Sequence, residues 1–246
     1  MVDSAIDQAK QAVRERVWTT MEREGVALPP GAHGRIPKFV GAELAAERLA
    51  ELPQWKAARV VKSNPDWAQL PVRIRALEDG KLLYMAVPRL ATLKPFYLLD
   101  PAQLRAPFDT VATGDGAAQL APKVAVEEMR PVDLVVAGSV AVSRDGVRIG
   151  KGAGYSDIEV ALLTEAGLIG PNTVIVTTVH AVQVLDEELP ETEYDFSVDL
   201  VVTPDEVITA GLPRRRPPGI AHEHLSNHKV NEIPVLRQTI VVDPKP

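Results

Sequence analysis

The chain has 246 residues, 46% of them hydrophobic and 24% charged, a length and composition typical of one large globular domain rather than a disordered or coiled-coil protein. Its 33 acidic and 27 basic residues give a net charge of −6, which argues against a broad nucleic-acid-binding surface. Cysteine is absent, which excludes disulfides, thiolate nucleophiles and cysteine-ligated zinc. Neither a signal peptide nor a stretch of about 18 apolar residues is recognisable, so we expect a cytoplasmic protein without a membrane span.

The first predicted element is an amphipathic helix of roughly twenty residues. Apolar residues recur at intervals of three or four positions from Ile6 to Met21. Lys10 and Arg14 lie four positions apart on its flank, so their positive charges project in the same direction. A solvated helix face gives the same pattern, and the spacing alone leaves both interpretations open.

Two helices and two strands are predicted in the rest of the first half. A second helix is expected at 41–52, after a connection rich in proline and glycine, and a short strand at 59–62 follows it. A short helix at 71–79 ends at Gly80, and a buried strand at 82–87 comes next.

Three β-branched runs mark the second half, at 132–136, 174–178 and 198–202. They show no polar alternation, as is typical of strands covered on both faces in a parallel sheet. A helix predicted at 156–166 joins the first two and completes a βαβ unit. We therefore expect one α/β domain over the whole chain, a three-layer α/β/α arrangement with a mostly parallel sheet, and an extended proline-rich tail at 213–246.

The best-marked candidate site is the glycine-rich turn at 150–157, with the sequence GKGAGYSD. Gly150, Gly152 and Gly154 permit unusual backbone angles and a close approach of main-chain N–H groups to a ligand. Lys151 and Arg148 can add positive charge. The spacing matches neither the P-loop nor the Rossmann fingerprint, but the combination predicts a phosphate-binding turn.

The helix after this turn strengthens the prediction. Ser156 and Glu159 are three positions apart, immediately before an apolar run, and resemble a capping box. A helix N-terminus there would favour a bound anion. Asp157, in the first helical turn, would repel a nearby phosphate unless a divalent cation lay between them, so it is the candidate Mg²⁺ ligand, although a routine first-turn acid is the plainer alternative.

The stretch 132–158, and above all GVRIGKGAGYSD at 146–157, resembles the signature of the 5-formyltetrahydrofolate cyclo-ligase (methenyltetrahydrofolate synthetase) family. Lys10 and Arg14 match the N-terminal Lys and Arg that contact ATP phosphates in this family. A Gly-Lys pair at 80–81 and the segment 189–203, which includes Asp195, also match. The resemblance implies the cyclo-ligase fold, related to the NagB/RpiA/CoA transferase-like fold.

The chain also departs from the family pattern. Active members usually carry GGGYYDR, where this chain has GAGYSDI, so Ala153, Ser156 and Ile158 differ and the motif arginine is missing. The sequence at 139–143 and 179–186 resembles instead that of a paralogous, cyclo-ligase-like branch of the family. Nucleotide binding therefore carries over to this chain better than the choice of substrate.

The resemblance implies an ATP- and Mg²⁺-dependent enzyme that converts 5-formyltetrahydrofolate into 5,10-methenyltetrahydrofolate, or acts on a related formyl or amide compound. Lys10, Arg14, Lys151 and Mg²⁺ on Asp157 would neutralise charge, and Tyr155 would lie near the reacting groups. The alternative is a paralogue without this activity that binds nucleotide or folate in a regulatory role. A monomer or small homo-oligomer is expected.

Other residues of the sequence are candidates for binding. Lys62 and His180 each lie at the end of a predicted strand, where an open α/β sheet places its ligand, and are candidate substrate contacts or structural residues. A histidine cluster and an arginine run in the tail could bind metal and phosphate, although solvent exposure is the simpler explanation of both. The two groups are His222, His224 and His228, and residues 214–216.

Overall fold

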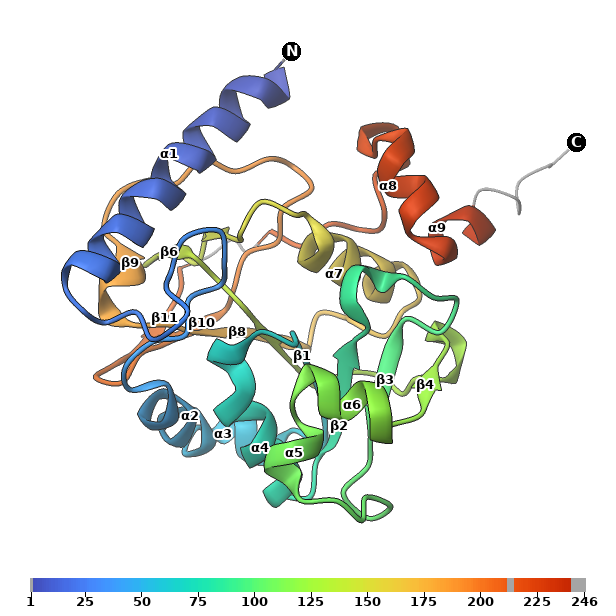
Figure 1. Ribbon diagram of the computed structural model, residues 1–246. Coiled ribbons are helices and arrows are strands. Elements are labelled where there is room, and N and C mark those ends of the chain that lie inside the picture. The colour runs from blue at the N-terminus through green and yellow to red at the C-terminus, as the bar shows by residue number, and fades with distance from the viewer. Residues whose placement is uncertain (1, 212–214, 240–246) are drawn as a thin grey trace, which may run out of the picture.

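The computed structural model describes residues 2–211 and 215–239. A sheet of eight strands runs through its centre (Figure 1). The five central strands are mutually parallel, and antiparallel strands close both edges. In spatial order the strands are β11 (Val207–Thr209), β10 (Leu200–Val202), β8 (Val174–Thr178), β5 (Leu134–Ala137), β1 (Val60–Ser63), β2 (Leu82–Ala86), β3 (Phe96–Leu99) and β4 (Lys123–Val124).

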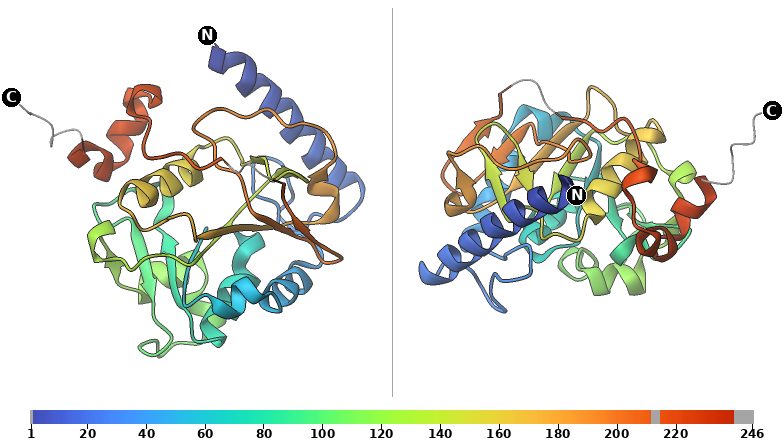
Figure 2. Two further views of the ribbon diagram at one scale, coloured as in Figure 1. Left: turned by 180° about the vertical axis from the view of Figure 1, so that it is seen from behind. Right: turned by 90° about the horizontal axis from the view of Figure 1, so that it is seen from above.

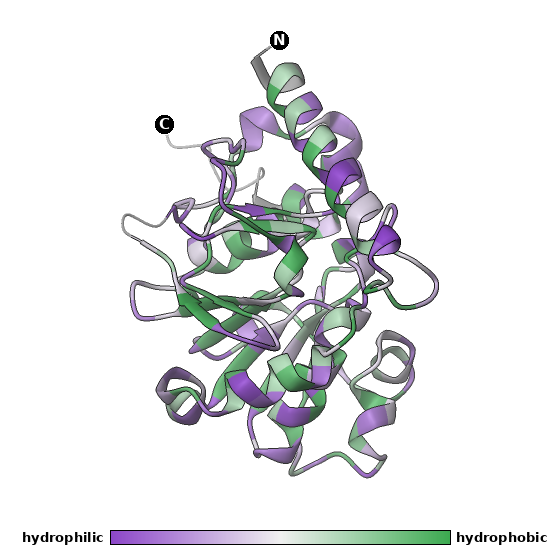
Figure 3. Ribbon diagram, turned by 90° about the vertical axis from the view of Figure 1, so that its left-hand side faces the viewer, coloured by the Kyte–Doolittle hydropathy of each residue, from purple (hydrophilic) through white to green (hydrophobic). Residues whose placement is uncertain are grey.

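The central strands are apolar on both faces because both faces are covered. In β5, Leu134 and Val136 belong to one hydrophobic cluster, whereas Val135 belongs to a second cluster on the opposite face. All three side chains are fully buried. Figure 3 shows the same contrast, with apolar strands inside and mixed helices around them. The predicted α/β class and the mostly parallel sheet are confirmed.

Helices cover the two faces unequally (Figures 1 and 2). Those from α2 to α6 pack against the first cluster, while α7 packs against the second. The helix α1 contacts the small second sheet. The bounds are α1 (Val2–Arg23), α2 (Ala42–Ala50), α3 (Pro53–Ala57), α4 (Leu70–Glu78), α5 (Phe108–Val111), α6 (Gly114–Leu120) and α7 (Tyr155–Glu165), with 3₁₀ turns η1 (Trp67–Gln69), η2 (Pro88–Leu90), η3 (Val126–Glu128) and η4 (Ala181–Gln183).

A second sheet of three short strands was not predicted. It consists of β7 (Arg148–Ile149), β6 (Ala141–Ser143) and β9 (Val184–Leu185). The hairpin of β6 and β7 is antiparallel, and β9 pairs with β6 in parallel. This hairpin leads directly into the glycine-rich turn and so determines where the turn lies.

The segment from 213 onward is not an extended tail in its described part. It contains η5 (His222–His224), α8 (Asn227–Glu232) and α9 (Pro234–Thr239), while residues 213–214 and 240–246 lie outside the described residues. The Ser226 hydroxyl accepts a hydrogen bond from the Lys229 amide, which caps α8. Ile233 and Leu236 are fully buried in the second hydrophobic cluster. This burial holds the helices against the domain and explains the difference from the sequence-based expectation.

In the described part of the chain, no helix is long and apolar enough to cross a membrane.

Candidate functional site

A cleft of about 1000 Å³ opens at the carboxyl ends of the central parallel strands. Asn64 follows β1 and Val87 follows β2, and both line the cleft. This is where open α/β sheets bind their ligands. One side of the cleft, here called the glycine-rich side, is formed by residues 148–157 with Lys10 and Arg14 of α1. The other, the C-terminal side, is formed by residues within 219–232 together with Arg89.

The predicted glycine-rich turn ends directly at the N-terminus of α7. Gly152 and Gly154 have φ angles of 97° and 72°, which side chains rarely adopt. A Cβ atom at Gly150 would lie 3.0 Å from the Arg148 guanidinium, and one at Gly152 would lie 3.3 Å from that of Arg14. The glycines therefore make room for two cations.

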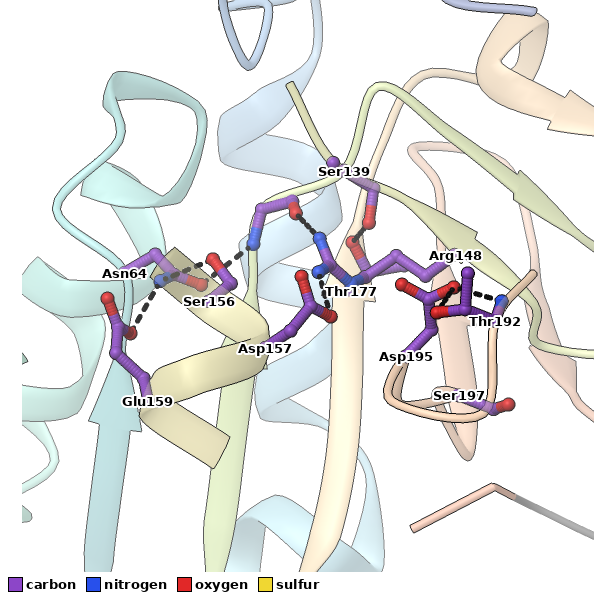
Figure 4. Close-up of polar contacts among 12 residues, drawn as sticks. Asn64, Ser139, Arg148, Ser156, Asp157, Glu159, Thr177, Thr192, Asp195 and Ser197 are labelled. Carbon is purple, nitrogen blue, oxygen red and sulfur yellow. Dashed lines mark hydrogen bonds and ion pairs between the residues drawn. The ribbon is translucent and has the colours of Figure 1, made fainter. Parts of the chain in front are cut away.

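The predicted capping box at Ser156 and Glu159 is wrong. The residue before α7 is Gly154, and no side chain among the described residues caps this helix. Ser156 Oγ instead accepts a hydrogen bond of 3.1 Å from the Asn64 amide, which also donates to Glu159 Oε2 at 3.0 Å (Figure 4). Long-range partners hold both side chains, so the first N–H groups of α7 are not satisfied by a cap.

Beneath the helix lies a buried ion pair. Lys62, whose side chain is 1% exposed, forms a short hydrogen-bonded ion pair with Glu159. Burial raises the pKa of Glu159, and the nearby Lys62 charge opposes that shift. Lys62 is not among the residues that line the cleft, so the structure gives this candidate substrate contact a position beneath the site, where it holds α7 to β1.

Two of the predicted phosphate contacts come from α1. Lys10 Nζ lies 2.5 Å from Asp195 Oδ2. Arg14 Nε donates a 2.7 Å hydrogen bond to the Gly150 carbonyl. Burial lowers the pKa of Arg14, and the charges of Asp7 and Asp195 oppose that shift. The helix α1 thus brings both residues to the turn, as their four-residue spacing allowed.

Arg148 occupies the centre of this side. Its guanidinium donates to the Gly138 carbonyl at 2.8 Å and to Asp157 Oδ1 at 3.1 Å (Figure 4). It also lies 4.3 Å above the Phe196 ring. Burial raises the pKa of Asp157, the positive charge of Arg148 lowers it, and the negative charge of Asp195 raises it further. Arg148 therefore partly compensates a carboxylate that burial would otherwise disfavour.

Lys151 lies at the edge of the turn. Its side chain is largely exposed, and its Nζ lies 3.7 Å from Asp66 Oδ1. This exposure and the length of the contact allow the Lys151 side chain to reorient toward a ligand.

Tyr155 faces the C-terminal side of the cleft. Its hydroxyl donates a 2.6 Å hydrogen bond to Glu232 Oε2, and Lys229 Nζ lies 3.3 Å from the ring centroid. Burial, together with this bond to Glu232, raises the pKa of Tyr155 to about 12. The phenol is therefore protonated at neutral pH and acts as a hydrogen-bond donor, not as a base.

The candidate histidines lie in two places. His180 does not line the cleft: its Nδ1 accepts a 3.3 Å hydrogen bond from the Val182 amide, its ring meets Phe39 edge-on, and burial lowers its pKa. In the tail, His224 stacks on Tyr194 at 4.1 Å. Within residues 2–211 and 215–239, no cluster of three or more His, Asp or Glu residues could hold a metal ion.

Several residues of the site were not among the predicted candidates. They are Asn64, Asp66, Arg89, Lys229 and Glu232. Asn64 follows a parallel strand directly, and this position could have identified it. The other four reach the cleft through contacts between segments that are distant in sequence, which no local pattern reveals.

The comparison with known sequences agrees with the predicted resemblance. The sequence model of the 5-formyltetrahydrofolate cyclo-ligase family matches residues 6–204. A bovine protein named methenyltetrahydrofolate synthase domain-containing protein is 40% identical over 234 residues, which cover 93% of this chain and 61% of the relative. The human protein of the same name is 38% identical over 241 residues, covering 96% and 63%. The chain thus spans about three-fifths of these relatives' length.

Among solved structures, the NMR structure of Aquifex aeolicus 5,10-methenyltetrahydrofolate synthetase matches with a TM-score of 0.53 and 21% sequence identity. The match covers 92% of this chain and 100% of that one, so the two share their fold. The chain belongs to the 5-formyltetrahydrofolate cyclo-ligase family.

Proposed function

We propose that this protein is an ATP- and Mg²⁺-dependent ligase that converts 5-formyltetrahydrofolate into 5,10-methenyltetrahydrofolate, with release of ADP and phosphate. The observation that carries the proposal is the convergence of Lys10, Arg14 and Arg148 on the uncapped N-terminus of α7, inside one large cleft. A family whose substrates are a nucleotide and a folate requires a site of this kind.

The glycine-rich side is suited to the phosphates of ATP. The free N–H groups at the start of α7 and the positive end of its dipole attract an anion. Lys10 and Arg14 add charge from α1, and Lys151 can fold onto an outer phosphate. Arg14 and Arg148 are already held by backbone carbonyls, so they need little reorganisation when the nucleotide binds.

The acidic groups of this side fit Mg²⁺ bound between the protein and the phosphates. Magnesium is usually held by one or two carboxylates, with substrate phosphates and water completing the shell. Asp157 can supply such a ligand, because its side chain is 25% exposed and its hydrogen bond with Arg148 engages Oδ1. Asp195 is engaged by Lys10 and by the Thr192 amide. When bound, the ion would offset charge on the phosphates.

The reaction asks the chain mainly for positioning and charge neutralisation. The formyl oxygen attacks the γ-phosphorus and ADP leaves. The second folate nitrogen then attacks the activated formyl carbon and loses its proton, and the formyl oxygen leaves as phosphate, which takes up that proton. Lys10, Arg14 and Lys151 would stabilise the charge that moves between phosphates. Tyr155, protonated at neutral pH, can donate a hydrogen bond to the substrate once Glu232 no longer accepts it. The proposal includes a cytoplasmic location and a monomer or small homo-oligomer.

A turnover assay tests the proposal. Purified protein is incubated with ATP, Mg²⁺ and 5-formyltetrahydrofolate, and the absorbance of the methenyl product is followed together with released phosphate. We expect equal amounts of both products, and loss of turnover in Asp157→Asn. Binding of both ligands without turnover would contradict the proposed reaction and support the ligand-binding alternative.

A further inference from the structure

A carboxylate lies among three donors on the C-terminal side of the cleft. Glu232 accepts the 2.6 Å hydrogen bond from the Tyr155 hydroxyl. Arg89 Nη1 lies 3.5 Å from its Oε1, and Lys229 Nζ lies 3.8 Å from its Oε2. All four residues line the cleft. A phenol and two cations around one carboxylate form the arrangement that a protein uses to bind an anionic ligand group.

The four residues come from three parts of the chain: Arg89 from η2, Tyr155 from α7, and Lys229 and Glu232 from α8. Arg89 lies in η2, directly after β2, where it and Leu90 have left-handed φ angles of 59° and 51°. Two consecutive non-glycine residues in this region are strained, and such strain is typical of functional sites. Leu90 is fully buried, which holds the backbone in this conformation. Arg89 itself remains exposed, with 72% of its side chain accessible.

Glu232 and Lys229 lie on α8, beyond the residues 6–204 that match the family. The nearby hydrogen bond to Tyr155 and the positive charge of Lys229 lower the pKa of Glu232, so it is ionised at neutral pH. The C-terminal segment therefore brings its own anion to a cationic site in the cleft.

We propose that Arg89, Lys229 and the Tyr155 hydroxyl form a binding site for a ligand carboxylate, and that Glu232 occupies this site until such a ligand displaces it. The proposal rests on the proposed function in one respect: the glutamate end of the folate is the source of the carboxylate. The phosphates then bind at the glycine-rich side and the carboxylate at the C-terminal side. Glu232 excludes ligands that lack an anion strong enough to replace it.

Binding of a small carboxylate probe tests this site without ATP or turnover. The probe is N-(4-aminobenzoyl)-L-glutamate, and 4-aminobenzamide, which has the same ring and amide but no carboxylate, is the comparison ligand. In Glu232→Gln the competing negative charge is gone while the side-chain shape remains, so the probe should bind about tenfold more tightly. In Arg89→Ala it should bind about tenfold more weakly. Titration calorimetry measures both.

The controls are Glu127→Gln and Arg105→Ala, two exposed positions outside the cleft, which should leave probe affinity unchanged. 4-Aminobenzamide should bind equally to every variant. Unchanged or weaker probe binding in Glu232→Gln, or binding of the probe to neither wild type nor Glu232→Gln, would overturn the inference. If the probe responds as expected but 5-formyltetrahydrofolate and ATP are not turned over, the carboxylate site stands and the proposed reaction falls.

Discussion

The two sides of the cleft differ in how their cations are held. On the glycine-rich side, Arg14 and Arg148 donate short hydrogen bonds to backbone carbonyls, at 2.7 and 2.8 Å. On the C-terminal side, Arg89 is exposed and meets Glu232 at 3.5 Å. The first side is preorganised by the fold, and the second can rearrange when one carboxylate leaves. Fixed cationic side chains are suited to phosphates that must be positioned for transfer. Cationic side chains that can rearrange are suited to the selection of a substrate.

The largest expected effect concerns the buried ion pair of Lys62 and Glu159, which lies beneath the glycine-rich side. Glu159→Gln leaves Lys62 buried without its ion-pair partner, and we expect the free energy of unfolding to fall by about 3–5 kcal/mol. The double variant with Lys62→Met removes both charges and should recover most of that loss. Urea denaturation measures both, and a double variant as unstable as the single one would contradict a buried charge penalty.

A somewhat smaller loss is expected from Arg148→Met. The variant removes the bond to the Gly138 carbonyl and leaves Asp157 without its cation, so the free energy of unfolding should decrease by about 3 kcal/mol. Arg144→Met on the same hairpin is the matched control, because Arg144 is half exposed and forms surface ion pairs with Asp186 and Glu206. It should cost at most about 1 kcal/mol. An equal decrease in the free energy of unfolding in both variants would show that Arg148 does not stabilise the glycine-rich side.

Gly152→Ala tests whether the turn itself makes room for a cation. The φ angle of 97° should cost about 1–2 kcal/mol for alanine, and its Cβ would lie 3.3 Å from Arg14. Gly25→Ala, at φ 67° with no atom within 4 Å of the added Cβ, should cost a similar amount. Only Gly152→Ala should weaken Mg²⁺-ATP binding. The same nucleotide affinity in both variants would show that the turn does not position Arg14 for a phosphate.

The smallest expected effect is a pH dependence at Asp157. Its pKa is raised by burial, so the folded chain retains this proton at a pH at which an ordinary Asp has lost it. As the pH falls from neutral toward the ordinary pKa of an Asp, acidification should therefore weaken Mg²⁺-ATP binding, whereas the contribution of Asp157 to the free energy of unfolding should grow. Protonation of ATP itself affects Asp157→Asn equally. Titration calorimetry at several pH values should thus show that Mg²⁺-ATP affinity declines more steeply in wild type than in Asp157→Asn. Parallel declines in the two proteins would argue against Asp157 as the Mg²⁺ ligand.

Much of the central sheet and of the glycine-rich side could be predicted from the sequence because the signals are local. The runs at 132–136, 174–178 and 198–202 correspond to β5, β8 and β10, and the glycine-rich turn precedes α7 as expected. The spacing of Lys10 and Arg14 placed both on one flank of α1. The strands β6, β7 and β9 escaped prediction because each has only two or three residues, too few for a periodic pattern.

The capping box was wrongly predicted because long-range contacts hold its two residues. Ser156 and Glu159 have the local spacing of a cap, but Asn64 and Lys62 bind them from more than 90 positions away. The C-terminal side depends on long-range contacts as well: Glu232 meets Tyr155 across 77 positions and Arg89 across 143. Tertiary contacts determine the structure at both places, and a local sequence pattern does not reveal such contacts.

The central claim is that ATP phosphates bind on the glycine-rich side and not on the C-terminal side. Calorimetric titration with Mg²⁺-ATP of Lys10→Ala, Arg89→Ala and wild type tests it directly. We expect the affinity to be about tenfold lower in Lys10→Ala, because one charge-assisted contact is lost. In Arg89→Ala the affinity should be unchanged. Unchanged binding in Lys10→Ala, or an equal loss in both variants, would contradict it.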